Sequence, residues 1–130
     1  MNKEFERFVK TKFTLEIRQR GKILFRSKRD GVSGLLLFIK KYGRKYKNLV
    51  FFDKVVGRAA ALLFVYLKAK EVYGVIGSKP AARVLYKFKI KYYFKKTVPG
   101  IINKTKTGSC PMEKLSKGKT PERLYNLLKK

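Results

Sequence analysis

The feature that most constrains the fold is an alternation of short apolar segments with helical segments through the middle of the chain. Strands are predicted over Asn48–Phe52, Glu71–Ile76 and Ile90–Lys96, and helices between them over Lys54–Lys68 and Ser78–Phe88. Strands that are joined through helices run parallel in one sheet, and the helices cover that sheet. The pattern therefore predicts an α/β protein.

The segments on either side of this core predict a hairpin and further helices. Phe13–Ile17 alternates apolar and polar residues, as a half-buried strand does, and Lys22–Ser27 returns as the second arm of the hairpin. Gly31–Tyr42 carries apolar residues at helical spacing. Shorter helices are expected within residues 1–10 and over Pro111–Ser116 and Pro121–Leu128. We interpret residues 1–11 as an N-terminal helical extension and residues 12–130 as a single domain.

The chain has no histidine and one cysteine, Cys110. Common zinc sites need several His or Cys ligands, so we expect no metal and no other cofactor. Ser–His and Cys–His nucleophile pairs are excluded because no imidazole is available as the base. A lone cysteine cannot form an intrachain disulfide, which fits a cytoplasmic protein.

No signal peptide or membrane span is predicted. The chain starts with acidic residues among its first six and has no apolar run there. Its longest apolar run, Ala59–Leu67, is nine residues long, whereas a membrane helix needs about 20. We expect a soluble cytoplasmic protein that has no membrane partner.

The charge is strongly unbalanced, with 34 Lys and Arg against 8 Asp and Glu and a formal net charge of +26. Such a field attracts polyanions and steers anionic ligands, although a lysine-rich bias on solvated faces has the same composition. The positions of the charged residues along the chain add one constraint, because Val72–Met112 contains nine basic residues and no acidic one. One side of the fold is therefore predicted to be electropositive.

Loops that follow parallel strands form a candidate anion site. Ligands of open α/β sheets bind outside the carboxyl ends of the strands, where helices begin. Helix N-termini present free N–H groups and favour phosphate or carboxylate. This rule selects residues after the predicted third and fourth strands: Asp53, Lys54, Gly57, Arg58, Ser78 and Lys79. The alternative is structural, with Gly57 serving close packing and Ser78 capping a helix.

A second candidate segment precedes the expected helix at Pro111. Its residues of interest are Asn103, Gly108, Cys110, Pro111, Met112 and Glu113. A thiol at the start of a helix among lysines has a depressed pKa, so Cys110 is a candidate nucleophile with Glu113 as a proton carrier. The alternatives are that Cys110 is a small buried residue and that Glu113 only favours the helix N-terminus.

Three blocks of residues resemble a known family. They are Asp53–Leu63, then Val98–Pro99 with Ile102–Asn103, and Gly108–Lys114. From about Phe13 to the C-terminus the chain resembles the prokaryotic domain of unknown function 1893 family, whose fold is cytidine-deaminase-like. The resemblance implies a three-layer α/β/α sandwich around a five-stranded mixed sheet with strand order 2-1-3-4-5, in which the last two strands are parallel.

The resemblance does not imply deamination. Working deaminases hold zinc with a His or Cys plus Glu at one helix start and Pro-Cys-x-x-Cys at the next. The corresponding positions here are Gly31–Gly34 and Asp53–Val56, which contain no zinc ligand of that pattern. The scaffold is therefore expected to lack the metal chemistry.

Three functions remain open on these residues. The first is non-catalytic binding of a nucleotide-like or phosphorylated small molecule, with the Asp53–Arg58 and Asn103–Glu113 blocks meeting at one site. The second is nonspecific RNA or DNA binding on a basic face, with Tyr93 stacking between Lys91 and Lys95. The third is a metal-free enzyme built on Cys110, Glu113 and Asp53. The ligand and the oligomeric state are left open.

Overall fold

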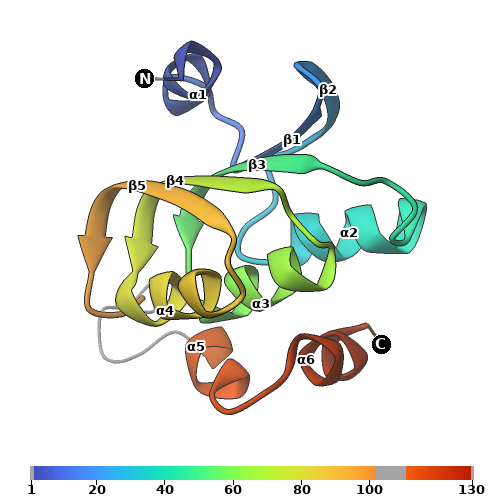
Figure 1. Ribbon diagram of the computed structural model, residues 1–130, viewed down its shortest axis with the longest axis vertical. Helices are drawn as coiled ribbons and strands as arrows, with labels where there is room; N and C mark the ends of the chain where they lie inside the picture. The colour runs from blue at the N-terminus through green and yellow to red at the C-terminus, as the bar shows by residue number, and fades with distance from the viewer. Residues whose placement is uncertain (1, 102–110, 130) are drawn as a thin grey trace.

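A computed structural model describes residues 2–101 and 111–129, the last range without the side chains of residues 111–113. Its centre is a five-stranded sheet in the order β2-β1-β3-β4-β5, which confirms the predicted order (Figure 1). β1 pairs antiparallel with β2 and β3, whereas β3, β4 and β5 run parallel. The strands are β1 Leu15–Gln19, β2 Lys22–Ser27, β3 Leu49–Val56, β4 Glu71–Ser78 and β5 Lys91–Val98.

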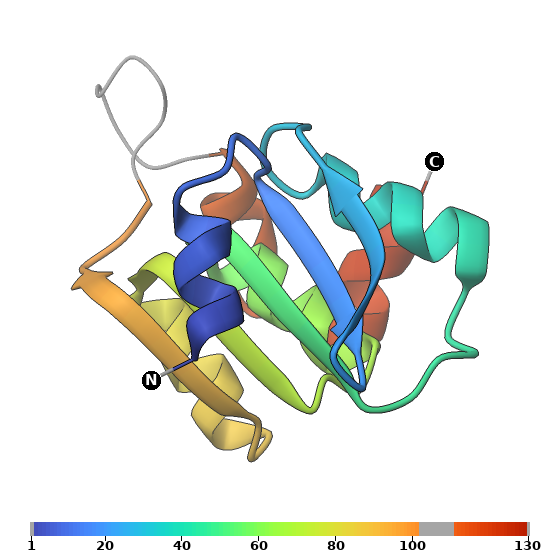
Figure 2. The same cartoon turned by 90° about the horizontal axis from the view of Figure 1, so that it is seen from above.

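Helices cover both faces of the sheet. α1 lies across one face, and α2, α3 and α4 pack on the other, with α5 and α6 against the outer side of α3 (Figures 1 and 2). The helices are α1 Lys3–Val9, α2 Ser33–Tyr42, α3 Arg58–Tyr66, α4 Lys79–Lys87, α5 Pro111–Ser116 and α6 Pro121–Leu128. None of the helices in these described ranges is long and apolar enough to cross a membrane.

Each face of the sheet has its own apolar core, because alternate residues of a strand point to opposite sides. In β3, Phe51 belongs to the large cluster beneath α2, α3 and α4, and Phe52 to a smaller one with Phe5 and Phe8 of α1. Phe5 and Phe8 are fully buried. Their burial packs α1 firmly onto the sheet.

α3 is apolar on nearly all sides, and its place in the fold explains why. Every residue from Ala59 to Phe64 is buried. The sheet lies on one side of α3, and α5 and α6 lie on the other. A helix between two layers has no solvent face, so its sequence loses amphipathic periodicity.

Two predicted boundaries at the carboxyl edge were wrong. β3 continues to Val56 and α3 starts at Arg58, so Asp53 and Lys54 lie inside a strand, not at its end. The polar pair looked like a strand end, but the ladder continues: Val55 pairs with Ile76, and the Lys54 N–H donates to the Thr14 carbonyl at 3.0 Å. β4 likewise runs beyond Ile76 to Ser78.

Two smaller predictions had opposite outcomes. The predicted helix Ser78–Phe88 was one residue too long at its C-terminus, because α4 ends at Lys87 and Phe88 is its C-cap, 42% exposed. The predicted hairpin is confirmed, and at its turn Arg20 and Gly21 have φ of 51° and 79°. Two positive φ values at the centre of a two-residue turn match the twist of the flanking strands.

Candidate anion site at the carboxyl edge of the sheet

The starts of α3 and α4 lie side by side. β3 and β4 are parallel, and Val56 pairs with Gly77, so the next residues, Gly57 and Ser78, lie at the same edge of the sheet as the N-caps of α3 and α4. Neither helix has an acidic residue in its first turn. By contrast, α1 carries Glu4 and Glu6 there. The positive ends of two neighbouring helix dipoles are therefore not offset by carboxylates within those first turns.

Ser78 has a structural role at this edge, as a helix cap. Its side-chain oxygen accepts a hydrogen bond from the Ala81 N–H at 3.1 Å, and the residue is fully buried. Pro80 occupies the first turn of α4. Ser78 is thus a helix cap in the interior, while its neighbour Lys79 is exposed.

Gly57 leaves the start of α3 without a side-chain cap. Its backbone is extended, with φ −95° and ψ −178°, a conformation that any residue adopts. What glycine contributes here is the absence of a side chain beside the first N–H groups of α3. Arg58 follows it as the first residue of the helix and is half-buried.

Asp53 lies within the sheet, 7% exposed, between Leu15 of β1 and Gly74 of β4. Its Oδ1 accepts a hydrogen bond from the Val55 N–H at 3.2 Å. Burial raises the pKa of the Asp53 carboxyl well above its ordinary value, outweighing the backbone hydrogen bonds and the charge of Lys54, which lower it. The fold therefore favours the neutral acid, set back from the strand end.

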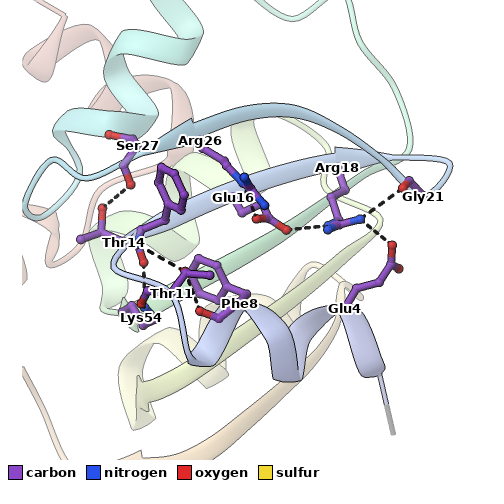
Figure 3. A network of polar contacts seen from close by, with 11 residues as sticks. Glu4, Phe8, Thr11, Thr14, Glu16, Arg18, Gly21, Arg26, Ser27 and Lys54 are labelled. Atoms are coloured by element: carbon purple, nitrogen blue, oxygen red, sulfur yellow. Dashed lines mark hydrogen bonds and ion pairs between the residues drawn. The ribbon is translucent and has the colours of Figure 1, made fainter.

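Lys54 was expected to line this site, and the structure places it on the opposite face. Its Nζ donates to the carbonyls of Thr11 and Phe13 at 2.5 and 2.8 Å and lies 4.7 Å from the centroid of the Phe8 ring (Figure 3). Because neighbouring strand residues alternate in direction, Lys54 faces α1 while Asp53 faces the helices. Burial lowers the pKa of the Lys54 ammonium, and the Asp53 charge opposes that shift.

Only part of the expected route of the C-terminal block can be followed. β5 runs parallel to β4, and Val98 pairs with Ser78, so β5 leaves the sheet at the predicted edge. The backbone of α5 packs against α3. Asn103, Gly108 and Cys110 lie outside the described residues, as do the side chains of Pro111, Met112 and Glu113. The meeting of the two blocks stays a prediction.

A polar network on the α1 face was missed by the sequence reasoning. Glu16 of β1 is 1% exposed and accepts from Arg18 Nε at 2.6 Å and from Arg26 Nε at 2.8 Å (Figure 3). Arg18 also pairs with Glu4 of α1. The one available signal was a glutamate between two apolar strand residues, Leu15 and Ile17. Three carboxylates of this basic chain, including Glu6, thus help to hold α1 on the sheet.

The basic side predicted from Val72–Met112 follows α4 and β5. Seven of its nine basic residues lie in the described ranges, and all seven are exposed: Lys79, Arg83, Lys87, Lys89, Lys91, Lys95 and Lys96. The ring of Tyr93, the expected stacking residue, is already in contact with another ring of the protein. Its ring lies edge-on to Phe5 at 6.2 Å, and neighbouring Lys95 pairs with Glu6 at 3.0 Å.

The described residues contain no group of three or more His, Cys, Asp or Glu that is placed to hold a metal ion. Their chemistry at this edge is that of N–H groups, two cationic side chains and one buried carboxyl.

Together these features define an α/β protein with a mixed five-stranded sheet of order 2-1-3-4-5 and a candidate anion site at its carboxyl edge. The model of the TM1506 family, a domain of unknown function (DUF1893), matches residues 4–130. The chain belongs to this family. The match begins inside α1.

A solved structure has the same fold. It is the crystal structure of a DUF1893 family protein (TM1506) from Thermotoga maritima, with a TM-score of 0.84 and 24% sequence identity. The similarity covers 98% of this chain and 90% of the other. A search of curated proteins gives no match.

Proposed function

We propose that this protein binds a nucleotide-like or phosphorylated small molecule, without catalysing its conversion, at the edge where α3 and α4 begin. The observation that carries the proposal is the pairing of Val56 with Gly77, which sets two helix starts without first-turn acids beside each other. Helix N-termini bind phosphate through N–H groups and the dipole. Two of them at one place favour an anion more than one does.

The cationic side chains at this edge are Arg58 and Lys79. Each is the first residue of its helix. Arg58 lies beside the uncapped N–H groups of α3. At α4, by contrast, the Ala81 N–H donates to Ser78 and Pro80 has no N–H, so α4 contributes mainly its dipole and Lys79. The guanidinium of Arg58 suits a phosphate because its donors form a planar fork, and Lys79 adds a mobile charge. Lys54 and Ser78 are no longer part of the proposed ligand set.

Two further groups enter the proposal on different grounds. Asp53 lies deeper in the sheet, and burial raises the pKa of its carboxyl, which favours the form that does not repel an anion at the edge. The block from Asn103 to Glu113, with Cys110, remains part of the hypothesis on sequence grounds alone.

Calorimetric titration with inorganic phosphate, adenosine monophosphate and ribose 5-phosphate tests the proposal. We expect binding by at least one of the three and a loss of about tenfold in affinity in Arg58→Gln, because a hydrogen bond to a charged group is worth about 1.5–3 kcal/mol. Lys79→Gln should also weaken binding. Lys87→Gln, at the far end of α4, removes the same charge and is the matched control.

The variants distinguish binding at a specific site from nonspecific electrostatic attraction to a basic protein. An equal loss in Lys79→Gln and Lys87→Gln would contradict the proposal, as would the absence of binding by all three probes. Deamination of adenosine monophosphate or of cytidine by the wild-type protein would contradict the non-catalytic assignment.

A further inference from the structure

A hollow lies at the opposite edge of the sheet, where β3 and β4 begin. It is lined by Arg44, Tyr46, Lys47, Asn48, Leu67 and Lys68 and encloses about 480 Å³. Its walls are the loop between α2 and β3 and the loop between α3 and β4, at the right of Figure 1. We infer that this hollow and the tyrosines around it bind single-stranded nucleic acid. The inference is independent of the proposed function at the carboxyl edge.

The hollow has fixed walls. The Lys70 N–H donates to the Leu49 carbonyl at 2.8 Å and joins the two loops. The Gln19 side-chain amide donates to the Lys47 carbonyl at 2.7 Å and ties the first loop to β1. Leu67, which is buried, contributes the apolar part of the lining. A site held in this way needs little reorganisation when a ligand binds.

The charged residues that line the hollow are all positive. The lining includes three exposed cations, Arg44, Lys47 and Lys68, and no acidic residue. None of the three forms an ion pair with an acid in the described part of the chain. In the sequence, no acidic residue occurs between Asp30 and Asp53. These cations are available to contact successive phosphates of a polyanion.

Tyrosine rings accompany the cations. Tyr46 lines the hollow and meets the Tyr42 ring edge-on at 5.6 Å, with Lys45 Nζ 5.3 Å from the centroid of the Tyr46 ring. On the other side, the Arg44 guanidinium lies 4.4 Å from the centroid of Tyr66. The Tyr66 ring itself stacks on Tyr125 of α6, with 4.6 Å between the centroids. Tyr66 therefore positions Arg44 beside the hollow, and Tyr46 is the ring that we infer stacks with a base.

This combination selects among polyanions. Rings offer faces on which unpaired bases stack, and cations beside them track the phosphates, which is how proteins bind single strands without reading their sequence. The bases of a duplex stay stacked on each other, so a duplex would contact only the cations. A single phosphate would contact only one or two of these cations. The spread of charge and rings over two loops therefore favours a single strand.

Fluorescence anisotropy with labelled oligouridine and oligothymidine of about 12 nucleotides, and with a blunt duplex of the same length, tests the inference. In Tyr46→Leu we expect the affinity for both single strands to fall about tenfold, because stacking of one base is worth about 1–3 kcal/mol. Tyr86→Leu removes a tyrosine that is 79% exposed outside the hollow and should leave affinity unchanged. Neither variant should alter duplex binding.

Further variants keep the test decisive if Tyr46→Leu destabilises the fold. Tyr46→Phe keeps the ring and should bind like the wild type. The double variant Lys47→Gln/Lys68→Gln should reduce the dependence of log affinity on log salt by about 0.7 for each lost phosphate contact. Lys87→Gln/Lys91→Gln removes the same charge elsewhere and should change that slope less.

Three results would overturn the inference: equal losses in Tyr46→Leu and Tyr86→Leu, a loss of duplex binding as large as that of single-strand binding, or equal salt slopes in the two lysine pairs. Phosphatidylserine vesicles are an additional probe. Binding to them that depends on Tyr46 and exceeds the binding of oligouridine would assign the hollow to a membrane surface instead.

Discussion

At the carboxyl edge of the sheet, the starts of α3 and α4 add positive backbone potential to the side chains of Arg58 and Lys79, whereas at the amino edge the positive potential comes from the side chains of Arg44, Lys47 and Lys68. Backbone N–H groups are short and fixed, so they suit a compact phosphate. Long cations beside tyrosine rings span several ångströms and suit a chain of phosphates and bases. The two proposals therefore assign different kinds of ligand to two parts of a chain whose net charge is +26.

The largest expected effect tests how closely the carboxyl edge is packed. A Cβ at Gly77 would lie 2.1 Å from a ring carbon of Phe94, so Gly77→Ala should lower the free energy of unfolding by about 3 kcal/mol. Gly100→Ala meets nothing within 4 Å and is the control. Urea denaturation measures both.

A double-variant cycle assigns the cause of that loss. With Phe94→Ala already present, the same glycine substitution should cost much less, because the clashing ring is gone. Equal stability of Gly77→Ala and Gly100→Ala would show that the Phe94 ring of β5 moves away from β4 easily, and would contradict the close packing inferred at this edge.

Loss of the buried cap should have an intermediate effect. Ser78→Ala leaves the Ala81 N–H without its partner in the interior, and we expect a loss of about 1–2 kcal/mol. Thr120→Ala removes the cap of α6, which accepts from the Arg123 N–H at an exposed position and should cost less because water replaces it. Thermal denaturation compares the two variants.

Ser78→Ala also separates structure from binding at this edge. Below its melting temperature the variant should bind inorganic phosphate like the wild type, since the Ser78 side chain is fully buried. If the folded variant lost phosphate binding selectively, Ser78 would have to be counted among the residues that contact the ligand.

The smallest effect concerns Asp53 and pH. Because the folded-state pKa of Asp53 is raised, its ionisation makes the folded state less stable as pH rises above the unfolded value of about 3.9. Asp53→Asn removes this loss and keeps an oxygen acceptor for the Val55 N–H. The variant should therefore be more stable than the wild type at about pH 7 and close to it at about pH 4. Urea denaturation at both pH values checks this, and a stability difference that shrinks as pH rises contradicts it.

The sequence predicted the sheet better than it predicted the sites. The alternation of strands and helices predicted parallel strands covered by helices, because it depends on a pattern that is visible along the chain. The strand order was implied by the family resemblance. The end of β3 was misplaced because Asp53 and Lys54 interrupt an apolar run. Lys54 is tolerated there through the carbonyls of Thr11 and Phe13, about 40 residues earlier, and no local pattern shows that contact.

The amino-edge hollow had no sequence signal for a related reason. Its lining comes from two short loops, residues 44–48 and 67–68, which the strand pairing brings together. The ring of Tyr125, nearly 60 positions after Tyr66, adds a third segment. Each piece resembles an ordinary basic turn. Only their convergence joins rings and cations into one surface.

The most direct test of two separate anion sites is a competition measurement. Anisotropy of labelled oligouridine bound to the wild-type protein is followed at constant ionic strength while adenosine monophosphate is added to saturation of its own calorimetric titration. Since the two sites lie at opposite edges of the sheet, the oligonucleotide should stay bound, and both ligands should be held at once. Complete displacement, with an inhibition constant equal to the calorimetric dissociation constant, would contradict the account because it would mean that one site serves both anions.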